Sequence, residues 1–409
     1  MTMRKFLKRA AAAAVSLALL GGMLPAAGAA SDGVEAKLAS MTLREKVGQL
    51  FLVRPEALDF DKTSDNKTLT DSMRENLKQY PVSGIVMFRQ NITDAGQMTA
   101  FMQAFQDASA TPMLTAVDEE GGTVARLANH SAFDLPKYEN AAAIGATGDP
   151  ERAKAMGRTI GGYLKPYGFN LDFAPVADVN SNPKNPVIGK RAFSSDPNVA
   201  AAMVSAAVQG FHESGMLCTL KHFPGHGDTG EDSHYGTATT TKTWEEMKAV
   251  EMLPFEAGIA AGADVIMTAH ITTPNATTEG LPASMSYTML TERLRGELGF
   301  TGVICTDALE MKAISSHYSA KDAAVAALNA GADLLLMPAD LREAFDGVVS
   351  AVENGEVSEA RLNESVRRVL TLKEKAGFVF EVPAPAEENS VETVKLHDRI
   401  FEWFRQLWS

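Results

Sequence analysis

Residues 319–337, SAKDAAVAALNAGADLLLM, contain the structural unit that decides the fold of this chain. The alanine-rich first part predicts a helix, because alanine has the highest helix propensity. Gly331 marks the end of that helix, since glycine is the preferred residue just beyond a helix C-terminus. The aliphatic run that follows, ADLLLM, predicts a strand. Helix, glycine stop and strand therefore follow one another within one short stretch.

The same alternation of helix and strand runs through most of the 409 residues. Helices are predicted over 149–168 and 196–215, because each stretch begins with Asp-Pro, a cap followed by proline, and ends at glycine. The strand candidates are nearly continuous apolar runs, as expected for strands buried on both faces. They lie at 47–53, 82–88, 112–118, 169–179, 216–222, 263–271, 302–308 and 332–338.

Eight strands that alternate with helices predict a parallel sheet, which closes most simply as a single (β/α)8 TIM-type barrel. An open doubly wound sheet is the alternative, but no Gly-x-Gly-x-x-Gly turn follows the first strand candidate. We therefore predict an α/β barrel domain over residues 31–378. The two ends of the chain, 1–30 and 379–409, differ from it in composition.

Residues 1–30 have the composition of a secretory signal peptide. Four basic residues precede an uninterrupted apolar run, and small residues follow it up to a predicted cleavage site near Ala30. The apolar run is short for a transmembrane span, so an uncleaved N-terminal anchor is the less favoured alternative. We expect an exported protein, in an extracellular, cell-envelope or periplasmic location, whose mature chain contains no transmembrane span.

Residues 379–409 are predicted to form a linker and a C-terminal helix. The stretch 381–390 is linker-like, and the apolar residues of 391–408 recur at helical spacings in places. We expect this helix to pack on the barrel. Anchoring at a wall or membrane surface is the alternative, but three basic residues are balanced by three acidic ones, so anionic lipid would not attract the segment.

Composition excludes several classes of function. The formal charge of −13 argues against nucleic acid as a partner, because phosphates would repel the protein, and against electrostatic docking on an anionic membrane. Cys218 and Cys305 are the only cysteines, and each lies in an apolar run. They are therefore predicted to be separate buried residues, and a disulfide-rich scaffold or a cysteine-based zinc site is excluded.

Charged residues gather where the predicted strands end. In a barrel of this kind, chemistry collects at the carboxyl ends of the strands and in the loops that follow them. Burying so many charges without partners would be costly, and a polar ligand pocket accounts for all of them together. The residues at these positions are Asp118, Glu119, Glu120, Arg126, Arg191, Lys221, His222, His270 and Asp307.

One loop, KHFPGHGDTGEDSHYG at residues 221–236, is unusually rich in glycine and titratable groups. A metal site at His222 and His226 is disfavoured, because the intervening proline and glycine prevent the helix that a four-residue spacing requires. His226 and Asp228 are more consistent with hydrogen bonds inside the loop. Asp232 and His234 can form a dyad, in which the carboxylate orients the imidazole as a proton carrier.

Asp307 directly follows a predicted strand, so its carboxylate should lie at the mouth of the barrel. From position alone it could be a nucleophile, a metal ligand or a helix N-cap.

The loop sequence KHFPGHGDTGEDSH resembles the signature of glycoside hydrolase family 3, in its β-N-acetylglucosaminidase branch. DEEGGTVARL resembles the strand-three segment of that branch, where glutamine is more usual than Glu119. LDFAPVADVN, GKRAFSSDP and TDALEM match in the expected order and spacing. The resemblance extends from about residue 35 to about residue 375 and is specific, because the loop signature is long.

The resemblance implies a retaining, two-step mechanism. Asp307 matches the nucleophile that forms a covalent glycosyl-enzyme, His234 the general acid/base, and Asp232 its partner. A histidine acid departs from the usual pair of carboxylates. The glycines of the loop would let it move and bring the acid to the sugar. The positions that match sugar-binding residues are Asp118, Arg126, Arg191, Lys221 and His222.

Relatives outside this branch carry a second α/β domain that supplies a glutamate acid, and this chain leaves no room for one. We therefore expect a secreted exo-β-N-acetylglucosaminidase, a monomer without metal or cofactor. It would act on terminal β-linked N-acetylglucosamine of muropeptides or chitin fragments. The alternatives are a β-N-acetylglucosaminide phosphorylase, another β-glycosidase on the same barrel, and a non-catalytic barrel that binds cell-wall sugar.

Overall fold

The computed structural model describes residues 30–232, 236 and 238–381. The predicted leader, His234 and the predicted C-terminal helix over 391–408 lie outside the described residues. The expectations for these segments therefore stay predictions.

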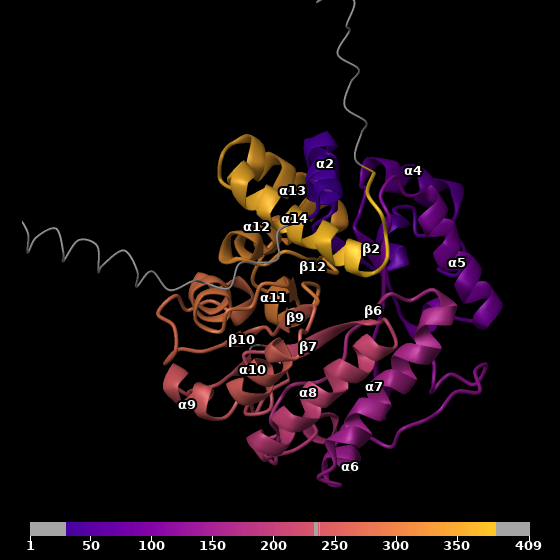
Figure 1. Ribbon diagram of the computed structural model, residues 1–409. Coiled ribbons are helices and arrows are strands. Elements are labelled where there is room, and N and C mark those ends of the chain that lie inside the picture. The colour runs from indigo at the N-terminus through magenta and orange to yellow at the C-terminus, as the bar shows by residue number, and fades with distance from the viewer. Residues whose placement is uncertain (1–29, 233–235, 237, 382–409) are drawn as a thin grey trace, which may run out of the picture.

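Eight parallel strands form one sheet that closes on itself (Figure 1). Neighbouring strands follow the order β11-β9-β7-β6-β3-β2-β1-β12, and a parallel bridge between Cys305 and Leu334 joins the two outer strands. The (β/α)8 barrel is thus confirmed, and the open doubly wound sheet is excluded. The strands are β1 Phe51–Val53, β2 Gly84–Met87, β3 Leu114–Val117, β6 Leu171–Asp172, β7 Leu217–Phe223, β9 Val265–Thr268, β11 Val303–Thr306 and β12 Leu335–Leu336.

All eight predicted strands are present, but most are shorter than the apolar runs that predicted them. The first run, 47–53, was wrong over its first part, because Val47 belongs to the helix α3, Leu43–Gly48. Thr42 and Glu45 form a capping box that starts this helix. Apolar residues alone do not reveal where a buried helix gives way to a buried strand.

The helices cover the outside of the barrel (Figure 1). The predicted Asp-Pro starts are confirmed, since Asp149 and Asp196 accept hydrogen bonds from the backbone of the first helical turn. Gly331, with φ of 124°, follows α12 as predicted. The main helices are α2 Asp32–Ser40, α4 Asp71–Gln79, α5 Ala95–Ala108, α7 Pro150–Leu164, α8 Pro197–Glu213, α9 Trp244–Ala249, α10 Met252–Ala260, the π-helical η6 Thr288–Glu297, α12 Ala320–Ala330, α13 Leu341–Glu353 and α14 Glu359–Lys375.

Two apolar layers form the core. The inner layer fills the barrel with side chains from the strands, including Leu52, Val86, Phe173 and Met267. The outer layer lies between the strands and the helices. Cys218 belongs to the outer layer and Cys305 to the inner one, and both are buried free thiols, as predicted.

The first and last helices that the structure describes, α2 and α14, lie side by side (Figure 1). The Ser31 hydroxyl donates to Glu374 at 2.6 Å, and Arg367 pairs with Glu35. These contacts join the two ends of the described chain. Among the described residues, no helix combines the length and the apolar character needed to cross a bilayer.

Two adjacent glycines in α7 predict opposite effects on stability. A Cβ at Gly161 would lie 2.1 Å from the Ser214 hydroxyl oxygen, whereas a Cβ at Gly162 would meet nothing within 4 Å. We expect Gly161→Ala to lower the melting temperature because helix and neighbour must separate. Gly162→Ala should raise the unfolding free energy by up to about 1 kcal/mol, since alanine favours the helix. Equal melting temperatures for the two variants would contradict the packing described here.

Candidate active site

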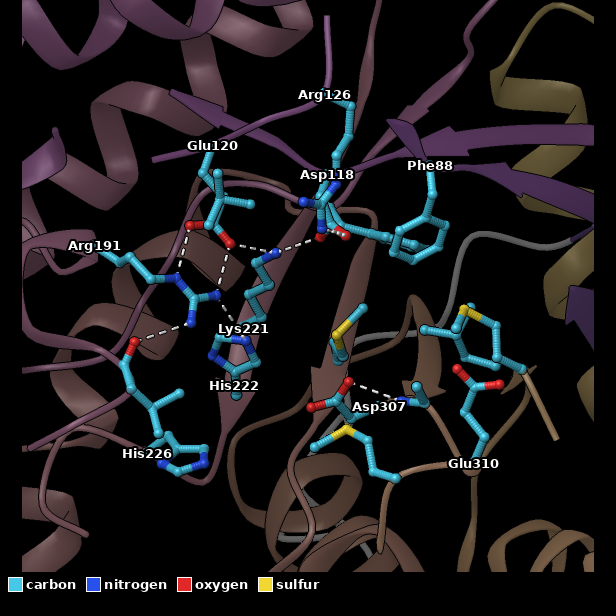
Figure 2. A pocket seen from close by; sticks show the side chains of 18 of the residues that line it. Phe88, Asp118, Glu120, Arg126, Arg191, Lys221, His222, His226, Asp307 and Glu310 are labelled. Carbon is cyan, nitrogen blue, oxygen red and sulfur yellow. Dashed lines mark hydrogen bonds and ion pairs between the residues drawn. The ribbon is translucent and has the colours of Figure 1, made fainter. Parts of the chain in front are cut away.

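A cavity of about 320 Å³ opens at the carboxyl ends of the barrel strands (Figure 2). Every predicted sugar-binding residue lines it, together with Asp307. The charged and aromatic side chains in its wall are Arg54, Phe88, Asp118, Glu120, Arg126, Arg191, Lys221, His222, His226, Asp307 and Glu310.

The ammonium group of Lys221 occupies the centre of a buried charge network (Figure 2). Its Nζ lies 2.8 Å from Asp118 Oδ1 and 2.6 Å from Glu120 Oε1. Arg126 donates to the other oxygen of Asp118 at 3.1 Å. Arg191 binds Glu120 with two nitrogens, at 2.9 and 2.7 Å. Four of the five predicted sugar-binding side chains are thus brought together, with Glu120 as an additional member.

The charges of this network shift the pKa of each member. Burial acts to raise the pKa of Asp118, but Lys221 and Arg126 outweigh it and hold that pKa below its usual value. Glu120 has a lowered pKa for the same reason, with Lys221 and Arg191 as the opposing charges. Burial acts to lower the pKa of Lys221, and the two carboxylates more than offset it. All three groups therefore stay charged at neutral pH.

His222, the fifth predicted binding residue, is held by a residue that sequence analysis did not select. Its Nδ1 lies 2.7 Å from Asp178 Oδ2, and its Nε2 lies 3.4 Å from Arg191. Because a guanidinium only donates, Nε2 is the acceptor and Nδ1 carries the proton. Burial acts to raise the pKa of Asp178, but His222 overcomes it and lowers that pKa. Asp178 also accepts from the His226 backbone at 2.6 Å, so one carboxylate orients two parts of the wall.

Asp307 follows β11 directly and projects into the cavity (Figure 2). Its backbone N–H donates to Thr268 at 2.9 Å, and its Oδ1 accepts from the Ala308 backbone at 2.7 Å. The helix N-cap alternative is wrong, because the next helix, α11 Lys312–Ser315, starts after Met311. A chemical role for Asp307 remains.

The loop after β7 is partly described. Asp232 is half-buried, and His234 lies outside the described residues, so their dyad stays a prediction. His226 Nδ1 lies 2.8 Å from the Thr229 hydroxyl, and Asp228 pairs with Lys242 at 3.1 Å. The prediction that His226 and Asp228 make hydrogen bonds within and beside the loop is confirmed.

Two glycines of this loop are explained by packing. A Cβ at Gly227 would lie 1.9 Å from the Val179 carbonyl oxygen. Gly225 has φ of 116°, and a Cβ there would lie 2.6 Å from Glu251. Mobility is therefore not needed to account for either residue. Gly230 and Gly236, further along, have open space around them.

Glu119, which stands where glutamine is more usual in the family that the segment resembles, does not face the ligand cavity. Its carboxylate accepts from the backbone of Leu127 and Ala128, at 2.9 and 2.8 Å, and from the Tyr163 hydroxyl at 2.8 Å. Burial raises its pKa. Glu119 therefore fixes the segment that carries Arg126 and does not bind substrate.

Several wall residues escaped the sequence analysis. Phe88 ends a predicted strand, and the Arg126 guanidinium stacks 5.1 Å from the centre of its ring. Arg54 and Glu310 form an ion pair of 2.7 Å at the edge of the cavity. Their positions just beyond β1 and β11 were the available signal, since residues at strand ends form the mouth of such a barrel.

Among the described residues, the side chains of His212, Cys218 and Asp264 place potential metal ligands within 4.8 Å of one another. They lie at the starts of β7 and β9, at the opposite end of the barrel from the cavity. Asp264 accepts from the Cys218 backbone at 3.1 Å and contacts His212 at 2.9 Å, so hydrogen bonding accounts for the group. His222 and His226 do not form a comparable cluster.

A closed parallel barrel with paired charges and a strand-end carboxylate in one cavity defines the class: an enzyme-type (β/α)8 barrel. Residues 42–372 match the model of the family described as "Glycosyl hydrolase family 3 N terminal domain". The chain belongs to this family.

Named relatives and a solved structure agree with this assignment. Beta-hexosaminidase A of Pseudoalteromonas piscicida is 37% identical over 337 residues, which cover 75% of this chain and 56% of that protein. Beta-hexosaminidase of Stenotrophomonas maltophilia is 39% identical over 298 residues, 72% of this chain and 87% of that protein. A family 3 beta-N-acetylglucosaminidase structure from Paenibacillus sp. has a TM-score of 0.78 and 38% identity, and covers 86% of this chain and 65% of that one. The chain thus spans less than two thirds of two of these proteins.

The lowered pKa values of Asp118, Glu120 and Asp178 predict a loss of stability in acid. Such carboxylates stabilise the fold fully above their unfolded-state pKa, about 4, and cease to do so as the pH falls through the lower folded-state pKa. Glu120→Gln should lower the melting temperature at neutral pH, because Lys221 and Arg191 lose a charged partner. It should also make the decrease below about pH 5 shallower, since one titrating group is gone.

Melting temperatures measured across this pH range, with Glu353→Gln as the control, would test the assignment. Glu353 is exposed and lies outside the cavity, so its replacement should leave the curve unchanged. An acid profile of Glu120→Gln parallel to that of the unmodified protein would contradict it.

Proposed function

We propose that the protein is a retaining exo-β-N-acetylglucosaminidase that removes terminal β-linked N-acetylglucosamine. The observation that carries this proposal is the placement of Asp307 in the same cavity as the network of Asp118, Glu120, Arg191 and Lys221. A nucleophile and a set of hydroxyl-binding groups then face one bound sugar. The relatives named beta-hexosaminidase support the choice of sugar.

The charged network binds the hydroxyl groups of the sugar. Asp118 stays ionised beside two cations and can accept from hydroxyls, while Lys221 and Arg191 donate. The groups are already paired and buried before a ligand arrives, so little reorganisation accompanies binding. His222, oriented by Asp178, completes the wall on the same side.

Asp307 acts as the nucleophile in the first step. A carboxylate oxygen attacks the anomeric carbon, an ester bond forms, and the bond to the leaving oxygen breaks. His234 gives its proton to that oxygen. In the second step His234 takes a proton from water, the water oxygen attacks the anomeric carbon, and Asp307 is released as a carboxylate. Asp232 orients the imidazole and favours its protonated form.

The proposed substrates are peptidoglycan or chitin fragments outside the cytoplasm. The leader composition of residues 1–30 supports export. In that location, terminal N-acetylglucosamine is presented by wall and chitin fragments.

Asp307→Asn should abolish turnover and leave the fold intact. An amide cannot serve as the nucleophile, so kcat should fall by several orders of magnitude, more than the loss of a binding contact would cause. Release of nitrophenol from the N-acetyl-β-glucosaminide measures the loss, and the melting temperature checks the fold. Hydrolysis close to that of the unmodified enzyme would exclude a covalent role for Asp307.

His234→Ala should slow substrates with poor leaving groups far more than substrates with good ones. A general acid helps most when the departing oxygen is basic, and its loss costs about 10²–10⁴-fold. A dinitrophenyl glycoside and an oligosaccharide provide the two extremes. Asp232→Ala should show the same bias more weakly. An equal loss on both substrates would assign His234 a structural role.

The rival functions can be separated with the unmodified enzyme. Nitrophenol release from the β-glucoside, compared with the N-acetyl-β-glucosaminide, distinguishes another β-glycosidase. Formation of a sugar phosphate when inorganic phosphate is added distinguishes a phosphorylase. Binding of sugar with no turnover of either glycoside would indicate the non-catalytic barrel.

A further inference from the structure

A second cavity, of about 450 Å³, adjoins the one that holds Asp307. It lies between the loop after β1, residues 54–70, and the loop after β12, residues 337–342. Arg54, Glu310 and Met337 line both cavities. A ligand that fills the first cavity can therefore extend into the second.

The shared wall lies beside the position where the glycosidic bond would break. Glu310 follows Asp307 by one turn of chain, and its ion pair with Arg54, at 2.7 Å, is only partly exposed. Figure 2 shows Asp307 between Glu310 on one side and Lys221 with Arg191 on the other. A sugar held by the charged network would thus direct its leaving group past Asp307 toward Glu310 and the second cavity.

The wall of the second cavity contains unused hydrogen-bond acceptors. Asp59 is only 4% exposed, and its Oδ2 accepts from the Ser64 backbone at 2.7 Å. Its Oδ1 and the side-chain oxygen of Asn66 are buried without a hydrogen-bonding partner in the described part of the chain. A buried acceptor without a partner is costly, and a ligand that donates a proton from a hydroxyl or amide would relieve that cost.

The remaining wall suits a sugar ring. Arg54, Lys62 and Arg342 can donate to hydroxyl and carbonyl oxygens, and Arg342 stacks 4.7 Å from the centre of the Phe60 ring. Pro338, Ala339 and Leu341 add apolar surface for the carbon face of a ring. Donors, acceptors and apolar groups on one concave wall are the ingredients of a small-molecule site.

The charge of this wall favours a neutral ligand. Its three cations are Arg54, Lys62 and Arg342, and its four carboxylates are Glu56, Asp59, Glu310 and Asp340. An added carboxylate on the ligand would therefore meet no excess of positive charge. The buried oxygens of Asp59 and Asn66 also require a donor, which a carboxylate cannot supply.

We propose that this second cavity binds the leaving-group sugar, an uncharged N-acetylated or hydroxylated unit of a chitin-type oligosaccharide, through Asp59 and Asn66. The assignment rests on the function proposed above. It selects neutral chitin fragments over muropeptides as the better substrates, because the second sugar of a muropeptide carries a carboxylate.

The test compares Asp59→Asn with the unmodified enzyme on two substrates. The β-linked dimer of N-acetylglucosamine fills both cavities, and the nitrophenyl N-acetyl-β-glucosaminide lacks the second sugar. Asparagine keeps the size of the side chain but can present a donor in place of Oδ1. The loss of kcat/KM should be about tenfold greater for the dimer, as expected when one hydrogen bond to a charged group is removed.

Asp61→Asn is the matched control. Asp61 belongs to the same loop, is exposed and does not line the cavity, so the ratio of the two kcat/KM values should equal that of the unmodified enzyme. An equal loss on both substrates in Asp59→Asn would overturn the second-cavity proposal and leave the proposed function standing. Failure of the unmodified enzyme to cleave either substrate would instead reject the proposed function.

A binding measurement separates the cavity from catalysis. In the Asp307→Asn background, calorimetry should show that the dimer binds more tightly than N-acetylglucosamine alone, and that Asp59→Asn removes most of this advantage. A dimer whose second sugar carries the lactyl carboxylate of muramic acid should bind more weakly than the neutral dimer. Tighter binding of the acidic dimer would overturn the assignment of a neutral sugar, and an unchanged advantage would overturn the role of Asp59.

Discussion

The buried ammonium group of Lys221 is the interaction on which the site depends. It reaches from the end of β7 to Asp118 after β3 and to Glu120 in the next segment, and Glu120 in turn holds Arg191 in the loop after β6. Taking so many charges out of water is costly, and removing one partner leaves the others uncompensated. The network therefore fixes the relative positions of three separate parts of the barrel mouth, and ligand binding uses groups that are already ordered.

The fold could be predicted because its signal is periodic. Eight apolar runs, Asp-Pro helix starts and glycine stops recur along the chain, and each was found in the structure. Strand boundaries were less predictable, as at Val47, where burial by a helix and by a strand leaves the same apolar signature. Closure of the sheet between β11 and β12 depends on strand tilt and stagger, which no local pattern contains.

The candidate site was predictable to the extent that its residues stand at strand ends. Asp118, Arg191 and Asp307 announce themselves by carrying charge just after an apolar run. Asp178 and Glu120 do not stand out in the same way, because their importance lies in the partners that they meet across the barrel. Pairing is a property of three-dimensional neighbours, and it separates a carboxylate that contacts a sugar from one that orients the group that does.

The pairing of β1 with β12 has a consequence for how the barrel is made. Residues 51–52 hydrogen-bond with residues 335–336, so the first strand keeps an unsatisfied edge until almost the whole barrel sequence has been synthesised. An open strand edge is a site of aggregation, and contacts between distant residues form slowly. Vectorial folding from the ribosome therefore cannot complete this barrel. A chain that folds only when its far end arrives remains extended for longer, which is the state in which a secretory channel accepts it.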